Sequence, residues 1–272
     1  MPELPEVETC RQGLLPYVLN HTIKQVIIRQ PHLRWCIPPE LPQYLINECF
    51  INIHRRGKYL LFEVSSQGTL LMHLGMSGRI RIISNDIPLN KHDHFDIVFN
   101  NNTCLRYNDS RRFGSILWWQ KEITQHPLLV NLGPEPLTQD FNDAYLLSAL
   151  TTRTQPLKLC LMNNHIVVGV GNIYANEVLF RSGIHPFKPA CQITVAEAAK
   201  LVAQIKTVLE EAIALGGTTL RDFLSVEGTS GYFQQTLYVY GRGNKPCRVC
   251  QSLLVEIRLG QRSTVFCETC QC

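Results

Sequence analysis

The sequence lacks long apolar runs, and none approaches the ~20 consecutive residues that a membrane-spanning helix needs. It also lacks an N-terminal basic region followed by an apolar block, so we expect no signal peptide. Internal repeats and low-complexity segments are missing as well, which argues against repeat and low-complexity architectures. We therefore expect a globular protein with no membrane partner.

A strong excess of charge of either sign is missing too. The formal net charge is +4, and hydrophobic residues make up 45% and charged residues 18% of the 272 residues, which is ordinary for a globular protein. Such a mildly basic chain permits a polyanionic partner without requiring one. Its length allows about two domains with ample core.

A disulfide framework is not indicated, because the number of cysteines is odd and seven of the eleven follow no pattern. Scattered thiols are typical of a reducing compartment, so we expect reduced thiols in a cytosolic protein. The seven residues are Cys10, Cys36, Cys49, Cys104, Cys160, Cys191 and Cys272.

The other four cysteines form two Cys-x2-Cys motifs, Cys247–Cys250 and Cys267–Cys270, separated by sixteen residues. This spacing predicts one structural zinc ion held by four thiolates, with a pair of disulfides as the alternative. Cys272 could compete as the fourth ligand, although the x2 spacing favours Cys270. The chain between the motifs is short, so the metal should contribute much of the free energy of folding this segment.

Basic residues outnumber acidic ones by five to two around these motifs. A basic zinc finger is typical of nucleic-acid binding, and a solvated basic surface is the alternative. The residues are Arg242, Lys245, Arg248, Arg258 and Arg262 against Glu256 and Glu268.

The first eight residues, Met1-Pro-Glu-Leu-Pro-Glu-Val-Glu8, predict the acidic start of a helix. Removal of Met1 would leave Pro2 with a free secondary amine beside Glu3. The helix dipole disfavours a charged amine there, which lowers its pKa and supplies a neutral nucleophile. A Pro-capped surface helix without chemistry is the alternative. Pro5 suits the first turn, and the apolar face is expected at Val7, Cys10, Leu14 and Val18.

Short β-like runs separated by turn residues predict an antiparallel sandwich or barrel in the first half. The segment His54-Arg-Arg-Gly-Lys58 is expected to precede one of the strands. The expected strands are residues 22–30, 59–64, 69–74, 79–83, 94–99 and 115–119.

A change of pattern at Leu132-Gly-Pro-Glu-Pro-Leu-Thr138 indicates a linker, with Thr138 as a candidate helix cap. The helical pattern that follows culminates in a helix over 194–215, which Gly216 and Gly217 would end. A flexible stretch is expected at 227–231. The apolar face of the long helix is expected at Val195, Ala198, Leu201, Val202, Ile205, Val208, Leu209 and Ala212.

These patterns predict an α+β multidomain chain. Its parts are an N-terminal sandwich or barrel with its opening helix at 1–132, a linker at 133–138, a helical domain at 139–236 and a zinc finger at 237–272.

Three Gly-bounded segments carry candidate binding residues. Gly169-Val-Gly-Asn-Ile-Tyr-Ala175 could bring backbone N–H groups and Asn172 to a phosphate, or it could be a packing turn. Arg153 and Lys158 just before it suit phosphate contacts or plain solvent exposure. The turns 73–78 and 109–114 present Met76, Arg111 and Phe113, which suit insertion into a base stack, with core packing as the alternative for Met76 and Phe113.

Together these stretches resemble the formamidopyrimidine-DNA glycosylase family, in that family's order and over nearly the whole chain. The resemblance implies an N-terminal β-sandwich with flanking helices, followed by a helix-two-turns-helix domain and a zinc finger, with DNA in the cleft between the two domains. The stretches are Pro2-Glu-Leu-Pro-Glu-Val-Glu-Thr9, Arg56-Gly-Lys-Tyr-Leu60, His73-Leu-Gly-Met-Ser-Gly78, Lys91-His-Asp-His94, Arg111-Arg-Phe-Gly114, Gly169-Val-Gly-Asn-Ile-Tyr-Ala175 and the four-cysteine finger.

The resemblance also implies an activity: base-excision repair of oxidised purines in double-stranded DNA by a monomeric enzyme of the bacterial cytoplasm. Pro2 would be the nucleophile, Glu3 the acid/base partner, and Lys58 and Arg262 would assist the elimination steps. DNA contacts would come from His73, His92, Arg111, Arg153, Lys158 and Asn172, and the gap left by the flipped base would be filled by Met76, Arg111 and Phe113.

The sequence departs from the family pattern at Ser110, where proline is usual, and at its Cys-Gln-Cys end. Three other functions compete with this one. An endonuclease VIII-type glycosylase would remove oxidised pyrimidines, but its opening resembles Pro-Glu-Gly-Pro-Glu, whereas this chain has Leu4. A non-catalytic zinc-finger DNA-binding protein has no need of Pro2 and Glu3, and a zinc domain for protein contacts has no use for the turns at Met76 and Phe113.

Overall fold

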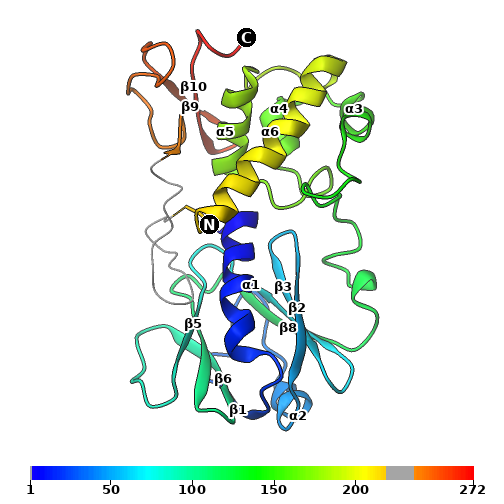
Figure 1. The fold of residues 1–272 in the computed structure, drawn as a ribbon, viewed down its shortest axis with the longest axis vertical. Helices are drawn as coiled ribbons and strands as arrows, with labels where there is room; N and C mark the ends of the chain where they lie inside the picture. The colour runs from blue at the N-terminus through cyan, green and yellow to red at the C-terminus, as the bar shows by residue number, and fades with distance from the viewer. Residues whose placement is uncertain (1, 219–235) are drawn as a thin grey trace. The chain divides into compact units, whose positions relative to one another are not determined.

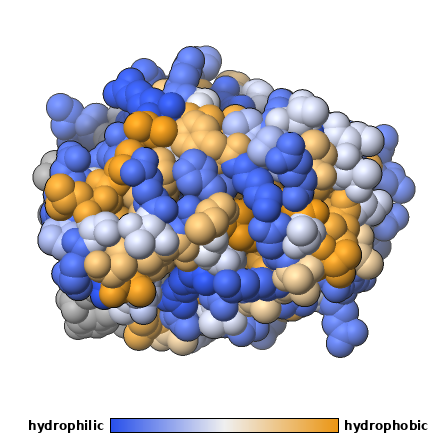
Figure 2. All heavy atoms as spheres, turned by 90° about the horizontal axis from the view of Figure 1, so that it is seen from above, coloured by the Kyte–Doolittle hydropathy of each residue, from blue (hydrophilic) through white to orange (hydrophobic). Residues whose placement is uncertain are grey.

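The computed structural model describes residues 2–218 and 236–272, which form two compact units (Figure 1). Among these residues, one unit contains 2–130 with 215–218, and the other contains 131–214 with 236–272. The stretch 227–231 lies outside the described residues. No helix in the described ranges is long and apolar enough to cross a membrane. Polar and apolar side chains are interspersed over the face shown in Figure 2.

The first unit is built on two four-stranded antiparallel sheets, ordered β2-β3-β4-β8 and β1-β6-β7-β5. This arrangement confirms the predicted sandwich. The strands are β1 (Ile23–Ile28), β2 (Phe50–Arg56), β3 (Tyr59–Val64), β4 (Thr69–His73), β5 (Arg79–Ser84), β6 (Asp93–Phe99), β7 (Thr103–Asn108) and β8 (Ser115–Trp119).

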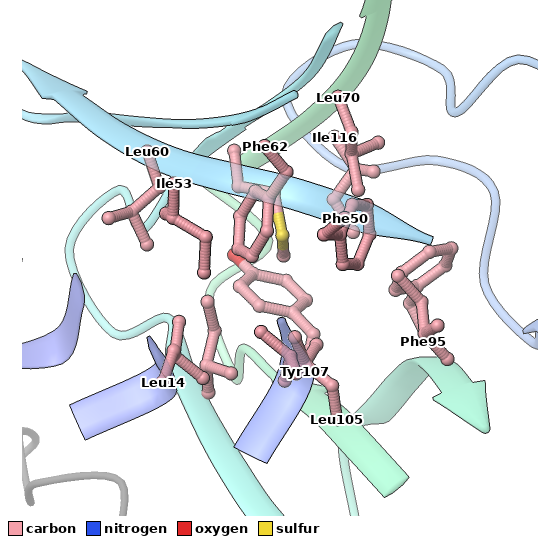
Figure 3. Close-up of a cluster of buried hydrophobic side chains, with 14 of the residues drawn as sticks. Leu14, Phe50, Ile53, Leu60, Phe62, Leu70, Phe95, Leu105, Tyr107 and Ile116 are labelled. Atoms are coloured by element: carbon pink, nitrogen blue, oxygen red, sulfur yellow. The ribbon is translucent and has the colours of Figure 1, made fainter. Parts of the chain in front are cut away.

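Apolar side chains from both sheets and from helix α1 (Leu4–Val18) form one core (Figure 3). The predicted face of α1 is confirmed, because Val7, Cys10, Leu14 and Val18 are all buried. Each fully buried Leu or Phe contributes about 1.5–3 kcal/mol. The core therefore holds α1, and with it the chain's first residues, against the sandwich.

The sequence pattern missed strands β2 and β7, whereas the segment 54–58 precedes β3 as predicted. His54 to Arg56 end β2, and Gly57 and Lys58 form the turn into β3. Charged side chains interrupt the apolar pattern in both strands, and the prediction relied on that pattern. In β7, Arg106 is buried and donates to Asp96 of β6 at 2.9 Å. A short helix α2 (Leu41–Leu45), with proline in its first turn, was also missed, because Pro42 was taken as a breaker.

The second unit consists of helices followed by a β-hairpin. The elements are α3 (Asp143–Leu150), α4 (Leu157–Leu161), α5 (Asn172–Ser182), the 3-10 turn η2 (Ala190–Gln192), α6 (Val195–Ala214), β9 (Val255–Leu259) and β10 (Arg262–Phe266); a further 3-10 turn, η1 (Ile123–Gln125), belongs to the first unit.

Two details of the helical prediction were wrong. The cap of α3 is Asn142, whose Oδ1 accepts from the backbone N–H of Tyr145 at 2.9 Å, and not Thr138. Val195 is 68% exposed, because it is the first residue of α6 and precedes the buried face. The other seven residues of that face are buried as predicted. Gly216 and Gly217 follow the helix with positive φ, which confirms the predicted stop.

Candidate functional site

The chain's first residues are buried and held in place. Glu3 is the N-cap of α1 and forms a capping box with Glu6, in which the Glu3 N–H donates to Glu6 Oε2 at 2.8 Å. Pro2, Glu3 and Glu6 are all buried. The capped, acidic helix start is therefore present as predicted, but its first turn is buried and not on the surface.

Glu6 also holds a distant segment, a role that sequence reasoning missed. Its Oε1 accepts from the N–H of Thr218 at 2.8 Å and from the Thr218 hydroxyl at 2.9 Å. Gly217, with φ +79°, lies so close that an added Cβ would be 3.0 Å from Glu6 Oε1. The spacing Glu3-x-x-Glu6 is the signal that could have indicated the capping box.

Lys58 and His73 are brought together by the register of two strands. Lys58 is the last residue of the turn between β2 and β3, and Tyr59, the next residue, pairs with His73 at the end of β4. The Tyr59 and His73 rings lie 4.8 Å apart. The Lys58 charge is near enough to depress the pKa of His73. The structure thus places Lys58, predicted to assist elimination, beside His73, a predicted DNA contact.

His73 is a neutral hydrogen-bond donor at physiological pH. Burial lowers its pKa to about 4, and the positive charges of Lys58 and Arg34 act in the same direction. Its Nδ1 accepts from the backbone N–H of Gly75 at 3.0 Å. The proton of the neutral ring therefore sits on Nε2, which is the atom able to donate to a phosphate oxygen.

Met76, Arg111 and Phe113 lie on two turns of the first unit. Phe113 is 46% exposed and carries the Arg111 guanidinium 4.7 Å from its ring centroid. Met76 is half-buried, and Arg111 is exposed. Core packing does not account for Phe113. The arrangement leaves an aromatic ring and a cation accessible together, as insertion into a base stack requires.

The predicted contact His92 is half-buried, with a positive φ of 72°. Its ring centroid lies 6.0 Å from that of His94, and its carbonyl accepts from the N–H of Asp109 at 3.1 Å. His92 is therefore attached to the turn that presents Arg111.

In the second unit, Lys158 and Asn172 both contact the β9–β10 hairpin. Asn172, the first residue of α5, donates through Nδ2 to the carbonyl of Ser263 at 3.0 Å. Lys158 is fully buried, and its Nζ donates to the same carbonyl at 2.8 Å and to Thr264 Oγ1 at 2.7 Å. The simple expectation of a solvated Lys158 is wrong. Arg153 is half-buried and donates through Nε to the carbonyl of Ala149 at 2.9 Å.

Arg262 is exposed at the first position of β10. The two residues before it, Gly260 and Gln261, have φ of +54° and +61°, as a two-residue hairpin turn with the right-handed twist of the strands requires. The carbonyl of Ser263, which Lys158 and Asn172 both contact, follows directly. The buried Lys158 and the half-buried Asn172 thus fix the backbone beside Arg262.

The four predicted cysteines come together in the second unit, where all four sulfur atoms lie within 4.8 Å of one another. The Sγ atoms of Cys250 and Cys267 are 3.4 Å apart, and those of Cys247 and Cys270 are 4.0 Å apart. Tetrahedral thiolates at about 2.3 Å from zinc would be about 3.8 Å apart. The residues present therefore fit one structural zinc ion.

Cys272 is exposed and is not part of the cluster, so Cys270 is the fourth ligand. None of the eleven cysteines, all within the described ranges, forms a disulfide. The clustering of all four sulfur atoms at one point fits the zinc site better than a pair of disulfides.

A cavity of about 550 Å³ opens elsewhere on the first unit, beside His54, Glu63 and Lys121. None of the residues predicted above as catalytic or DNA-binding lines it. We therefore locate the candidate site by the arrangement of its side chains and not by cavity size.

Three family models match the chain in order. The formamidopyrimidine-DNA glycosylase N-terminal domain matches residues 1–116, the H2TH domain of the same enzyme matches residues 132–224, and the zinc finger found in FPG and IleRS matches residues 244–271. These matches confirm the predicted order of sandwich, helix-two-turns-helix domain and zinc finger.

Full-length relatives are similar as well. The formamidopyrimidine-DNA glycosylases of Shewanella oneidensis and Shewanella halifaxensis are 53% and 52% identical over 271 residues, covering 100% of this chain and 99% of theirs. The crystal structure of the MutM (Fpg) protein from Thermus thermophilus is 37% identical, with a TM-score of 0.90 over 99% of this chain and 98% of that one. A Lactococcus lactis FPG mutant in complex with Fapy-dG containing DNA is 33% identical, with a TM-score of 0.93 over 99% of both chains.

Fold and cysteine cluster first define the class: a sandwich protein with a helix-two-turns-helix domain and a structural zinc finger. Identity over the full length then gives the family. The chain belongs to the formamidopyrimidine-DNA glycosylase family.

Proposed function

We propose that this protein removes oxidised purines, 8-oxoguanine and formamidopyrimidines, from double-stranded DNA and then cleaves the damaged strand. The observation that carries the proposal is the buried, capped start of α1, which presents Pro2 beside Glu3 in a chain of this family. A non-catalytic zinc-finger protein needs neither the proline nor its buried acidic neighbours.

The chemistry begins with the amine of Pro2. Its nitrogen attacks the sugar C1′ of the flipped nucleotide, the base leaves with its bonding electrons, and Glu3 supplies or accepts the protons. The nitrogen then loses its proton, and the C1′–O4′ bond breaks with a proton going to O4′, which opens the sugar and leaves an iminium at C1′. The iminium withdraws electrons and acidifies the adjacent sugar protons. Loss of such a proton expels the phosphate on one side, and a second elimination expels the other. A water nucleophile would release the base without cleaving the strand.

Basic and polar side chains hold the DNA strand. Neutral His73 donates from Nε2 to one phosphate oxygen, and Lys58 next to it supplies charge for the same backbone and assists β-elimination. Arg262 is exposed on the hairpin and is assigned to the second elimination. Asn172, Arg153 and His92 belong to the DNA-contacting set, whereas Lys158, predicted as a DNA contact, is fully buried and supports the hairpin beside Arg262 instead.

Base extrusion needs a replacement for the lost stack, because unstacking costs a few kcal/mol. Met76, Arg111 and Phe113 fill the gap, and Arg111 pairs with the orphaned cytosine. The exposed Phe113 ring with the Arg111 cation over it supports these roles. The zinc ion stabilises the finger and takes no part in the chemistry.

We further propose that the protein acts as a monomer in the bacterial cytoplasm, where its DNA substrate is found. The related chains from Shewanella and Thermus thermophilus support a bacterial setting.

Oxidised pyrimidines are the second candidate substrate class. A specific observation favours testing them: the wild-type Lactococcus lactis Fpg, 34% identical to this chain, has been crystallised with an oxidised pyrimidine containing DNA. Leu4 distinguishes the present opening from the endonuclease VIII type.

The test is single-turnover excision from duplexes that carry 8-oxoguanine, a formamidopyrimidine or an oxidised pyrimidine. We expect both purine lesions to be released faster than the pyrimidine, followed by strand cleavage at the same site. Faster release of the pyrimidine would favour the endonuclease VIII-type function, and DNA binding without excision would favour a non-catalytic binding protein.

A further inference from the structure

Asp109 is a fully buried carboxylate at the base of the turn that presents Arg111 and Phe113. Its Oδ1 accepts from the hydroxyl of Ser77 at 2.6 Å and from the N–H of Arg111 at 3.3 Å. Its Oδ2 accepts from the N–H of Gly114 at 2.8 Å and from the hydroxyl of Tyr107 at 3.0 Å. None of the ion pairs between described residues involves Asp109, so hydrogen bonds stabilise its buried charge.

The contacts of Asp109 reach both turns that carry the gap-filling side chains. Ser77 directly follows Met76 on one turn, and its hydroxyl also accepts from the N–H of Arg111 at 3.1 Å. Gly114 directly follows Phe113 on the other turn. The Asp109 carboxylate therefore contacts three groups: the residue after Met76, the backbone N–H of Arg111, and the residue after Phe113.

The backbone of Asp109 joins a third segment to these turns. Its carbonyl lies 2.8 Å from Nε2 of His94, and its N–H donates to the carbonyl of His92 at 3.1 Å. The predicted DNA contact His92 is thus fixed to the same point.

Close packing leaves these turns little room to shift independently. A Cβ added to Gly114 would lie 1.8 Å from the Tyr107 hydroxyl, and one added to Gly78 would lie 2.6 Å from the same oxygen. A Cβ on Gly75 would lie 2.4 Å from the carbonyl carbon of Phe113. Tyr107 itself is anchored in the core of the sandwich (Figure 3). The tyrosine hydroxyl and Asp109 therefore connect both turns to a rigid base.

We propose that Asp109 is a positioning residue, which holds Met76, Arg111 and Phe113 in one arrangement so that all three enter the DNA together. This inference rests on the proposed function and deepens it. Because insertion replaces a stacked base and Arg111 pairs with the opposite cytosine, Asp109 controls base extrusion and opposite-base preference. It touches neither the sugar nor Pro2.

Asp109→Asn is a sharp test because its effect follows from donor counting. An asparagine offers one acceptor oxygen and one donor NH2 in place of two acceptor oxygens. In one orientation the NH2 faces the N–H of Gly114, and in the other it faces the N–H of Arg111. The hydroxyls of Ser77 and Tyr107 can rotate, but a backbone N–H cannot. In the first orientation the Gly114 N–H loses the acceptor at 2.8 Å, and in the second the Arg111 N–H loses the carboxylate and keeps the Ser77 hydroxyl as its acceptor.

The experiment compares three readouts for the wild type and the variant: excision of 8-oxoguanine opposite cytosine, excision opposite adenine, and borohydride trapping on a single-stranded oligonucleotide with an abasic site. The last substrate has no opposite strand and no stack to replace. We expect Asp109→Asn to slow excision opposite cytosine about tenfold and to reduce the preference for cytosine over adenine. Trapping on the single strand should stay within about twofold of the wild type.

Asp96→Asn is the matched control. Asp96 is also a buried carboxylate of the first unit, but it accepts from Arg106 and Arg29 and none of its hydrogen bonds reaches either turn. Its replacement tests general loss of stability. We expect an unchanged cytosine preference in folded Asp96→Asn.

A second variant covers the case in which Asp109→Asn does not fold. Ser77→Ala removes one contact to the carboxylate and one to the N–H of Arg111. Its effect should be non-additive with Phe113→Ala, because both changes act through placement of the same side chains.

The outcomes separate this inference from the proposed function. If Asp109→Asn, or Ser77→Ala in its place, keeps wild-type excision and cytosine preference, the inference is wrong. It is also wrong if trapping on the single strand falls in the same proportion as excision. A wild-type protein that excises nothing and is not trapped would instead contradict the proposed function.

Discussion

His73 illustrates how burial sets the chemistry of a single residue at this site. Desolvation, followed by the charges of Lys58 and Arg34, lowers its pKa to about 4. The ring is therefore neutral near pH 7. In the proposed function, its contribution to DNA contact is the N–H of Nε2, and not a positive charge.

This shift predicts a pH dependence of stability. The unfolded chain binds a proton at His73 near pH 6.5, whereas the folded chain does so only near pH 4. Between these values the unfolded state holds more protons, so stability falls as pH is lowered through this window. In His73→Gln this contribution disappears. We expect the wild type to lose about 1 kcal/mol more than His73→Gln between pH 7.5 and 5, after allowance for solvent screening of a half-buried ring.

Urea unfolding of both proteins at pH 7.5 and pH 5 measures this difference. Above pH 7 both forms of His73 are neutral, so the stability difference between the two proteins should be constant there. Equal pH dependence of the two proteins between pH 7.5 and 5 would contradict the shifted pKa.

At the scale of single residues, some roles could not be predicted from the local sequence. Pro2 and Lys58 were predicted because short motifs contain them, and Arg262 because it is a basic residue of the four-cysteine finger. Glu6 and Asp109 were not, because their partners lie far along the chain: Glu6 binds Thr218 and Asp109 binds Ser77. From the sequence alone, a carboxylate is expected to be exposed to solvent. Only the fold shows which hydrogen-bond donors lie beside it.

At the scale of elements, α5 attaches the zinc finger to the helical part of the second unit. Asn172 donates to the carbonyl of Ser263, and Asn176 Oδ1 accepts from the N–H of Val265 at 2.9 Å. Glu177 is fully buried and accepts from three consecutive N–H groups of residues 238–240 at 2.8, 2.9 and 2.8 Å. Burial raises the pKa of Glu177, and the three donors act in the opposite direction.

Glu177→Gln should loosen the finger without removing its metal. The amide offers one acceptor where the carboxylate offers two, so at least one buried N–H loses its partner, at a cost of about 1–3 kcal/mol. We expect faster hydrogen exchange at residues 238–240 and a zinc content of about one ion per chain.

Two control variants accompany this test. Glu211→Gln changes a half-exposed partner of Arg181 in the same unit and should leave both readouts at wild-type values. Cys247→Ala should lose the zinc. Loss of zinc from Glu177→Gln, or unchanged exchange at 238–240, would contradict the assigned role of Glu177.

Most elements could be predicted because their apolar pattern is local. The pattern predicts β3 and β8 at their observed bounds, and seven of the eight positions that it assigns to the apolar face of α6 are buried. It misses β7, where the buried Arg106 is compensated by Asp96 on a neighbouring strand. Such compensation is a tertiary contact, which no window of sequence contains.

At the scale of the whole molecule, the two units divide the assigned residues between them. Pro2, Glu3 and Lys58 belong to the first unit, whereas Asn172 and Arg262 belong to the second. Each unit has its own apolar core or cluster. The proposed reaction needs both units, because the nucleophile and the zinc finger are not on the same one.

The most direct test of the whole account is borohydride trapping on duplex DNA with 8-oxoguanine opposite cytosine. The account predicts a covalent protein–DNA adduct when Pro2 is the free N-terminus. Pro2→Gly, or protein that retains Met1 or carries an N-terminal tag, should bind the duplex and lose most of the adduct. An adduct of equal yield from these proteins, or none from the protein that begins at Pro2, would contradict the account.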